Sequence, residues 1–158
     1  EGENFSVLVP DDGLRKDLAV PVGQQESSVS LYAARDGEAV YALMWIKGPS
    51  FGESDRGALN SSAKGFLYGF AEGYRRRNNE DFSCEPKGER QISVSGFSGS
   101  EYDLPSCTVP VKVRMYTRIV DGQRQMYIAA VFYNAPDKNV SRFIKSFTVT
   151  GSPTTDKR

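Results

Sequence analysis

Two Asp-Gly pairs, each between runs of residues typical of β-strands, constrain the fold of this chain more than any other feature. Asp-Gly favours the tight turn of a β-hairpin, because both residues tolerate the positive φ angles that such a turn needs. We therefore predict two hairpins and an antiparallel sheet. Their arms and turns are Ser28–Arg35, Asp36-Gly37 and Glu38–Ile46, and then Val109–Val120, Asp121-Gly122 and Gln123–Tyr133.

The second arm of the first hairpin is apolar on both faces. Side chains alternate across a strand, so its even-numbered and odd-numbered residues point to opposite sides. A strand with two apolar faces is buried on both, which predicts cover on each face of the sheet. The two sets are Val40, Ala42, Met44 and Ile46, and Tyr41, Leu43 and Trp45.

Two segments have the apolar spacing of helices and can supply this cover. Ser54–Arg77 carries one apolar stripe, and three arginines in its last turn complement the negative end of the helix dipole. Pro136-Asp137 opens a second, shorter helix. Its apolar face consists of Val140, Phe143, Ile144 and Phe147. We predict an α+β fold, an antiparallel sheet sandwiched by helices (α/β/α).

The remaining chain predicts short strands and one loop within a single domain over residues 1–150. Residues 14–25 contain Pro21 and Gly23 and are predicted to form a loop. Residues 151–158 are predicted to be a disordered tail. The short strands are Phe5–Val9, Arg90–Ser95, Ser100–Leu104 and Thr148–Thr150.

The sequence favours a non-catalytic protein. It contains no histidine, which removes His-dependent nucleophilic catalysis and His-containing zinc sites. Gly96-Phe97-Ser98-Gly99-Ser100 resembles a nucleophile elbow but has serine where the last glycine is required. No glycine-rich phosphate motif is present. We therefore predict no catalytic residue, no cofactor and no metal site.

The charge balance argues against nucleic acid as a partner. The chain has 20 Lys and Arg residues against 20 Asp and Glu residues, so its net charge is zero. It therefore lacks the overall positive field typical of nucleic-acid binding. No apolar run approaches the roughly 20 residues that a membrane-spanning helix needs. A protein or an anionic polymer is the expected partner.

One face of the second hairpin gathers basic and aromatic side chains. If Asp121-Gly122 forms a two-residue turn, Tyr116 pairs with Tyr127 and Arg118 with Gln125. Arginine and tyrosine often anchor binding surfaces. The alternative is a solvated face whose long side chains cover apolar neighbours. We call these residues the basic-aromatic set: Lys112, Arg114, Tyr116, Arg118, Gln125 and Tyr127.

Three glycines at a spacing of four lie within the long predicted helix. Each costs about 1 kcal/mol relative to alanine in a helix interior. Gly65, Gly69 and Gly73 therefore indicate that the backbone approaches a neighbour closely, either the sheet or a bound ligand. The second interpretation predicts a ligand groove between this helix and the sheet.

Cys84 and Cys107 are too few for a tetrahedral metal site and lie in polar, turn-like segments. In an exported protein they would form a disulfide. The alternative is two separate thiols in a cytoplasmic protein. The sequence leaves both pairing and compartment open.

The order of elements resembles that of the PsbP-like superfamily. The resemblance rests on the opening segment Phe5-Ser6-Val7-Leu8-Val9-Pro10 and the closing segment Arg142-Phe143-Ile144-Lys145-Ser146-Phe147. It implies an antiparallel sheet sandwiched by helices and a binding or accessory role, and the chain is more similar to the bacterial, exported branch of unknown function. It carries over no site residue.

Together these observations predict a non-catalytic accessory protein, exported to the periplasm or outside the cell, that binds a macromolecule through the basic-aromatic set. The alternative is a small-ligand carrier or enzyme with a pocket between the long helix and the sheet.

Overall fold

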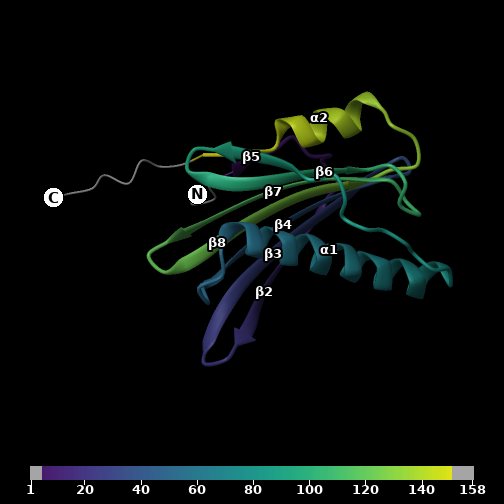
Figure 1. Ribbon diagram of the computed structural model, residues 1–158. Helices are drawn as coiled ribbons and strands as arrows, with labels where there is room; N and C mark the ends of the chain where they lie inside the picture. Colours follow the sequence, from purple (N-terminus) through teal and green to yellow (C-terminus); the bar gives the residue numbers. More distant parts are fainter. Residues whose placement is uncertain (1–4, 151–158) are drawn as a thin grey trace.

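The computed structural model describes residues 5–150; at Val22 it describes the backbone but not the side chain. The fold is α+β and is built on a seven-stranded sheet (Figure 1). Each pair of neighbouring strands is antiparallel, in the order β2-β3-β4-β8-β7-β6-β5. Two short strands, β1 (Phe5–Ser6) and β9 (Thr148–Val149), pair separately. The predicted tail over 151–158 lies outside the described residues. The sheet strands are β2 (Leu14–Val22), β3 (Gln25–Asp36), β4 (Ala39–Pro49), β5 (Arg90–Val94), β6 (Phe97–Leu104), β7 (Val111–Val120) and β8 (Gln123–Phe132).

Both predicted hairpins are present. In the second, Val120 pairs with Gln123, and Asp121 and Gly122 have φ angles of 51° and 74°. The predicted register is confirmed, with Tyr116 opposite Tyr127. In the first hairpin Asp36 pairs with Ala39, so the turn lies one residue later than predicted, at Gly37-Glu38. A turn with glycine in its first central position accounts for this shift.

The prediction of a loop over residues 14–25 is wrong. Leu14–Val22 forms β2, which pairs along its whole length with β3. Because β2 is an edge strand, one side of its backbone needs no partner strand, and Pro21 is tolerated there. Charged side chains in this strand discourage further edge pairing, and they also hide the alternation that identifies a strand in sequence.

Two helices complete the fold: α1 (Asp55–Asn78) and α2 (Lys138–Ser146). The side chain of Ser54 accepts a hydrogen bond from the Gly57 backbone and caps the N-terminus of α1. Asn79, in the left-handed conformation, ends this helix. Asp137 caps α2 by accepting from the Val140 backbone. Both predicted helices are therefore confirmed, within one residue for α1.

The buried side chains form two hydrophobic clusters that use alternate residues of β8. Successive side chains of a strand point to opposite faces, so both faces of the central sheet are buried, as the two-sided apolar strand predicted. One cluster joins Met126, Ile128, Ala130 and Phe132 to Ala58, Leu59, Ala63 and Leu67 of α1. The other joins Tyr127, Ala129 and Val131 to Val140, Phe143 and Ile144 of α2.

A buried guanidinium fixes the start of α1 to the sheet. The Arg124 side chain of β8 is 9% exposed. Its Nε lies 2.9 Å from Oε1 of Glu53, and its Nη1 lies 2.8 Å from Oδ1 of Asp55. It also donates to the Glu53 carbonyl and to the Thr117 hydroxyl. One side chain thus joins β8, β7 and the segment that leads into α1.

We expect Arg124→Met to lower the free energy of unfolding by about 2 kcal/mol. The variant keeps an apolar stem of similar length but leaves both carboxylates without their cation. These carboxylates are about one third exposed and regain water, which limits the loss. Urea denaturation measures the change. Lys47→Glu, at an exposed position of β4, is the control, and equal stabilities of Arg124→Met and wild type would contradict the assignment.

The structure joins Cys84 and Cys107 in a disulfide. Cys84 lies between α1 and β5, and Cys107 lies between β6 and β7. Two hydrogen bonds support the same junction: Thr108 N–H donates to the Ser83 carbonyl, and Ser83 N–H donates to the Thr108 hydroxyl. The disulfide therefore ties the long connection after α1 to the sheet.

Candidate functional site

The structure brings the basic-aromatic set together but does not leave it as an open surface. Tyr116 is 2% exposed and Tyr127 is 6% exposed, and both belong to the cluster that contains α2. The Tyr116 and Phe147 ring centroids lie 5.5 Å apart, and those of Tyr127 and Phe5 lie 5.3 Å apart. Burial also raises the pKa of the Tyr116 phenol. The prediction of Tyr116 and Tyr127 as surface residues is wrong, because these rings are part of the core.

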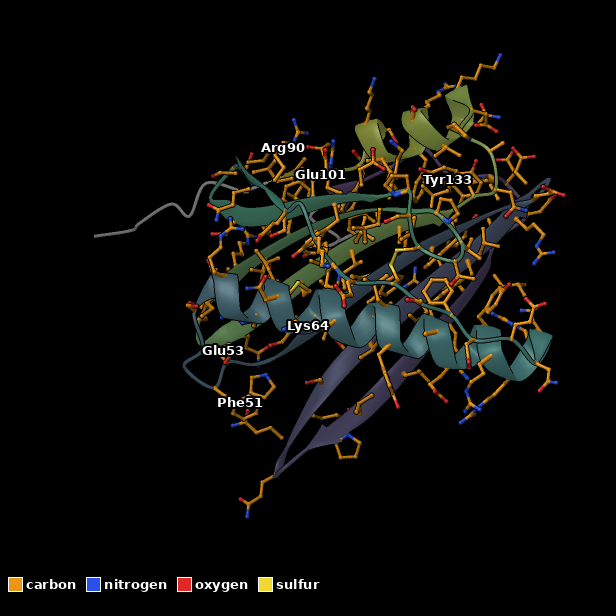
Figure 2. The ribbon with its side chains drawn as sticks, turned by 45° about the vertical axis from the view of Figure 1, so that its right-hand side comes forward. Phe51, Glu53, Lys64, Arg90, Glu101 and Tyr133 are labelled. Atoms are coloured by element: carbon orange, nitrogen blue, oxygen red, sulfur yellow. A yellow bond between two sulfur atoms is a disulfide. The ribbon has the colours of Figure 1, made fainter. Side chains whose placement is uncertain are left out.

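The cations of the set have partners within the chain. Arg114 forms an ion pair with Glu101 at 2.6 Å and donates to the Phe147 carbonyl at 3.2 Å. Glu101 also pairs with Arg90, and the labelled side chains of these two residues lie near each other in Figure 2. Lys112 pairs with Asp103 at 3.0 Å. These pairs neutralise the charges that the sequence suggested for a partner.

Arg118 is also engaged inside the fold. Its Nε donates to Oε1 of Gln125 at 3.0 Å, and its guanidinium lies 4.2 Å from the centroid of the Phe97 ring. Phe97 is fully buried. The long side chain therefore covers the core, which agrees with the alternative interpretation of the set.

The glycines of α1 make no close approach to the sheet. No atom outside the local helix lies within 4 Å of the position that a Cβ would take at Gly65 or Gly69. At Gly73 the nearest atom is Nη2 of Arg77, a side chain of the same helix, at 3.7 Å. Gly65 and Gly69 are exposed. The predicted packing role of these glycines is wrong, and they do not line the hollow described next.

A hollow of about 680 Å³ lies between the C-terminal half of α1 and the sheet. Its α1 wall includes Phe70, Tyr74 and Arg77. On the sheet side, directly paired residues of β3, β4 and β8 form a row: Arg35 opposite Val40, and Val40 opposite Phe132. Beside this row, Leu14 of β2 is opposite Ala33 of β3. We call this hollow the α1 groove.

The apolar part of the α1 groove is aromatic. The rings of Phe70 and Phe132 are stacked, with centroids 3.5 Å apart. Phe70 also contacts Tyr74 and Phe82, so aromatic side chains continue along the helix. Leu14 is 82% exposed and leaves further apolar surface at the groove's outer edge. This arrangement can bind an apolar or aromatic group.

The rim of the α1 groove is charged and polar. Arg35 and Arg77 are exposed, and none of the ion pairs among residues 5–150 involves either of them. The carboxylates of Asp12 and Glu38 lie on the same rim. Glu38 accepts a hydrogen bond from Asn134 at 3.0 Å. The two guanidiniums are therefore the groups left for an anionic part of a ligand.

The groove is open because the sheet is wider than α1. Six spacings between seven strands give a width of about 29 Å, and a helix with its side chains is about 10 Å across. The contacts of α1 with the sheet are mainly with β6 and β7. On the same face, β2 carries the partly exposed Leu18 and Val20. β2, which was predicted to be a loop, thus contributes to the part of this face that α1 does not cover.

A pocket between the long helix and the sheet was predicted from the sequence, but with different residues. The apolar stripe of Ser54–Arg77 was predicted to cover the sheet, and the arginines of its last turn to complement the helix dipole. Arg35 was not assigned to any site, because its presence in the same groove as Arg77 depends on the packing of α1. The apolar stripe of a helix does not show which of its side chains stay accessible after the helix packs on the sheet.

No cluster of three or more Cys, Asp or Glu side chains with the arrangement of a metal site occurs within residues 5–150. Neither helix in that range is long and apolar enough to cross a membrane.

Comparison with known proteins gave no match to this chain among family models, curated proteins or solved structures.

Proposed function

We propose that this protein binds a small amphipathic anion in the α1 groove, with the apolar part against Phe70 and Leu14 and the anionic group at Arg35 and Arg77. The single observation that carries the proposal is a hollow of about 680 Å³ that combines an apolar wall, with Phe70 and Leu14, with two guanidiniums lacking a carboxylate partner in the described part of the chain. Binding pockets for small molecules commonly have this size and this mixture of apolar wall and few polar groups.

An anion fits the groove better than a cation. Tyr74 directs its hydroxyl to Glu80, and Asn134 donates to Glu38, so these two carboxylates already have hydrogen-bond donors, whereas neither guanidinium has a carboxylate partner within residues 5–150. Guanidiniums bind carboxylates and phosphates with paired hydrogen bonds. The apolar length of the groove favours a molecule with a chain or ring attached to such a group. This is the carrier function that was predicted from the sequence as the alternative.

We further infer that the chain is a PsbP-like α/β/α sandwich. The two hydrophobic clusters support this inference, since one contains α1 and the other contains α2. Secretion to the periplasm or the cell exterior stays a prediction from the sequence. A role as an accessory protein is compatible with ligand carriage, but macromolecular binding through Lys112, Arg114, Tyr116, Arg118 and Tyr127 is not retained, because these residues are buried or paired.

Laurate is a suitable probe, and its displacement of the fluorescent anion anilinonaphthalene sulfonate measures binding. We expect saturable binding of laurate with one site per chain, and weaker binding of dodecylamine, which has the same chain with a cationic head. Ala33→Trp should lower laurate affinity about tenfold, since the new ring occupies the exposed floor position between Leu14 and Ala42. Arg77→Gln should lower it several-fold through loss of the charged head contact.

Two matched variants control for non-specific effects. Ala19→Trp places the same ring on β2 at an exposed residue whose side chain points to the opposite face, and Arg76→Gln removes a neighbouring cation that does not line the groove. Both should bind laurate like wild type. Equal affinity of Ala33→Trp and Ala19→Trp, or the absence of saturable binding, would refute the proposal.

A further inference from the structure

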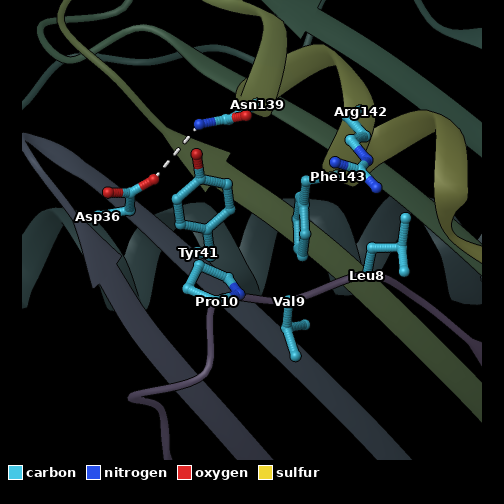
Figure 3. Close-up of a pocket in the computed structure, with 8 residues that line it drawn as sticks. All are labelled: Leu8, Val9, Pro10, Asp36, Tyr41, Asn139, Arg142 and Phe143. Atoms are coloured by element: carbon cyan, nitrogen blue, oxygen red, sulfur yellow. Dashed lines mark hydrogen bonds between the residues drawn. The ribbon is translucent and has the colours of Figure 1, made fainter.

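A second hollow lies on the other face of the sheet, beside α2. Its volume is about 280 Å³, and it is lined by the segment after β1, the end of β3, the start of β4, and α2. Figure 3 shows the side chains around it. They are Leu8, Val9, Pro10, Asp36, Tyr41, Asn139, Arg142 and Phe143.

The Tyr41 hydroxyl has no hydrogen-bond partner although the side chain is buried. Tyr41 is 2% exposed, and its hydroxyl is the buried side-chain polar atom without a partner among residues 5–150. Its ring packs edge-on against Phe143, with centroids 5.0 Å apart. A buried hydroxyl that lacks a partner is costly, so native structures almost always satisfy such groups. The hydroxyl borders the hollow, where a bound molecule can supply the missing partner.

The neighbouring groups indicate what kind of molecule this is. Burial raises the pKa of Tyr41 most, and the negative charges of Asp137 and Asp36 raise it further. The phenol therefore stays protonated and can donate a hydrogen bond. Arg142 of α2 is exposed at the same hollow, and no ion pair within the described part of the chain includes it. A donor and a cation at one site call for an acceptor with negative charge.

The other residues that line the hollow restrict the shape and the number of charges of a molecule that can bind there. Leu8, Val9 and Phe143 offer apolar surface. Asp36 accepts from Nδ2 of Asn139 at 3.5 Å, which leaves its carboxylate at the rim, turned to the α2 amide in Figure 3. A single anionic group directed to Tyr41 and Arg142, with an apolar body beneath, satisfies these constraints.

We propose that Tyr41 and Arg142 form a binding site for a small carboxylate with an apolar body, separate from the α1 groove. The Tyr41 hydroxyl donates to one carboxylate oxygen, Arg142 provides the counter-charge, and the apolar body lies against Leu8, Val9 and Phe143.

Phenylacetate and phenethylamine test this assignment, because the two probes have similar bodies and opposite charges. Titration followed by backbone amide chemical shifts should show saturable binding of phenylacetate, with the largest changes around Tyr41 and in α2. Phenethylamine should bind at least about tenfold more weakly. Stronger binding of the amine, or no saturation by phenylacetate at about 10 mM, would overturn the proposal.

Variants locate the site and exclude a purely structural role for the hydroxyl. Tyr41→Phe keeps the ring and should lower phenylacetate affinity about tenfold, while the thermal midpoint without ligand stays equal or rises. Arg142→Gln should weaken binding by a similar factor. Lys145→Gln, an exposed cation of the same helix that does not line the hollow, should bind like wild type. Unchanged binding by Tyr41→Phe would show that the hydroxyl meets only water.

The outcome is independent of the α1 groove. Ala33→Trp lies on the other face of the sheet and should leave phenylacetate binding unchanged, while Tyr41→Phe should leave laurate binding unchanged. Loss of phenylacetate binding in Ala33→Trp would instead place both probes in one site and overturn the assignment to Tyr41 and Arg142.

Discussion

Arg114→Glu is expected to lower the free energy of unfolding by about 3–5 kcal/mol. The Arg114 side chain is 15% exposed and pairs with Glu101, which is 20% exposed. The substitution places two carboxylates side by side and leaves the Phe147 carbonyl without its donor. Such a loss is a large part of the total stability of a typical domain, about 5–15 kcal/mol. Guanidinium chloride denaturation followed by circular dichroism measures the change.

Triple replacement of Lys112, Arg114 and Arg118 by glutamate should be more severe and remove the cooperative unfolding transition. The control is Lys47→Glu, a charge reversal at an exposed position of β4, which should change stability by no more than about 0.5 kcal/mol. If Arg114→Glu were as stable as Lys47→Glu, the basic-aromatic set would be open to solvent, and a binding role for it would have to be considered again.

Removal of the Cys84–Cys107 disulfide is expected to lower the free energy of unfolding by about 3 kcal/mol. The two cysteines are 23 residues apart in sequence, so the bond restricts a loop of substantial length in the unfolded chain. The folded state loses little else, because the hydrogen bonds between Ser83 and Thr108 hold the same segments together. The measurement compares denaturation of the oxidised protein with that of the Cys84→Ser/Cys107→Ser variant.

Reductant provides the control for this comparison. Wild type in excess reductant should unfold at the same denaturant concentration as the double variant, and reductant should not affect the variant. If the oxidised and reduced wild-type proteins were equally stable, the bond would have no stabilising role in solution. A loss far above the expected value would show that the connection after α1 also depends on the bond for its native packing.

The local elements could be predicted from the sequence because their signals are local. Asp121-Gly122 determines a tight turn, and that turn fixes the pairing of Tyr116 with Tyr127 without reference to the rest of the fold. Ser54 and Asn79 mark the ends of α1 through contacts within a few residues. By contrast, β2 is held by its pairing with β3, and its charged residues and Pro21 suit an edge position that only the assembled sheet provides.

The candidate sites could be predicted only in outline. The odd and even residues of β4 indicated a strand buried on both faces; the structure buries both faces at β8, while the even-numbered side chains of β4 are only half-buried. The sequence could not show that Tyr116 and Tyr127 lie under Phe147 and Phe5, so basic residues interleaved with tyrosines were interpreted as a surface. Nor could it show that Tyr41 would be buried without a hydrogen-bond partner, since this depends on what α2 and the segment after β1 place beside it.

The sequence by itself determined the hairpins, the helices and the two-sided core, because turn geometry, capping and apolar periodicity act between residues close in the chain. Only the tertiary structure decided which faces stay open. α1 covers the β6 and β7 side of a sheet about 29 Å wide, so the side formed by β2, β3 and β4 keeps a groove. The presence of Arg35 and Arg77 in one groove, and of Tyr41 and Arg142 at one hollow, depends on how separate elements pack.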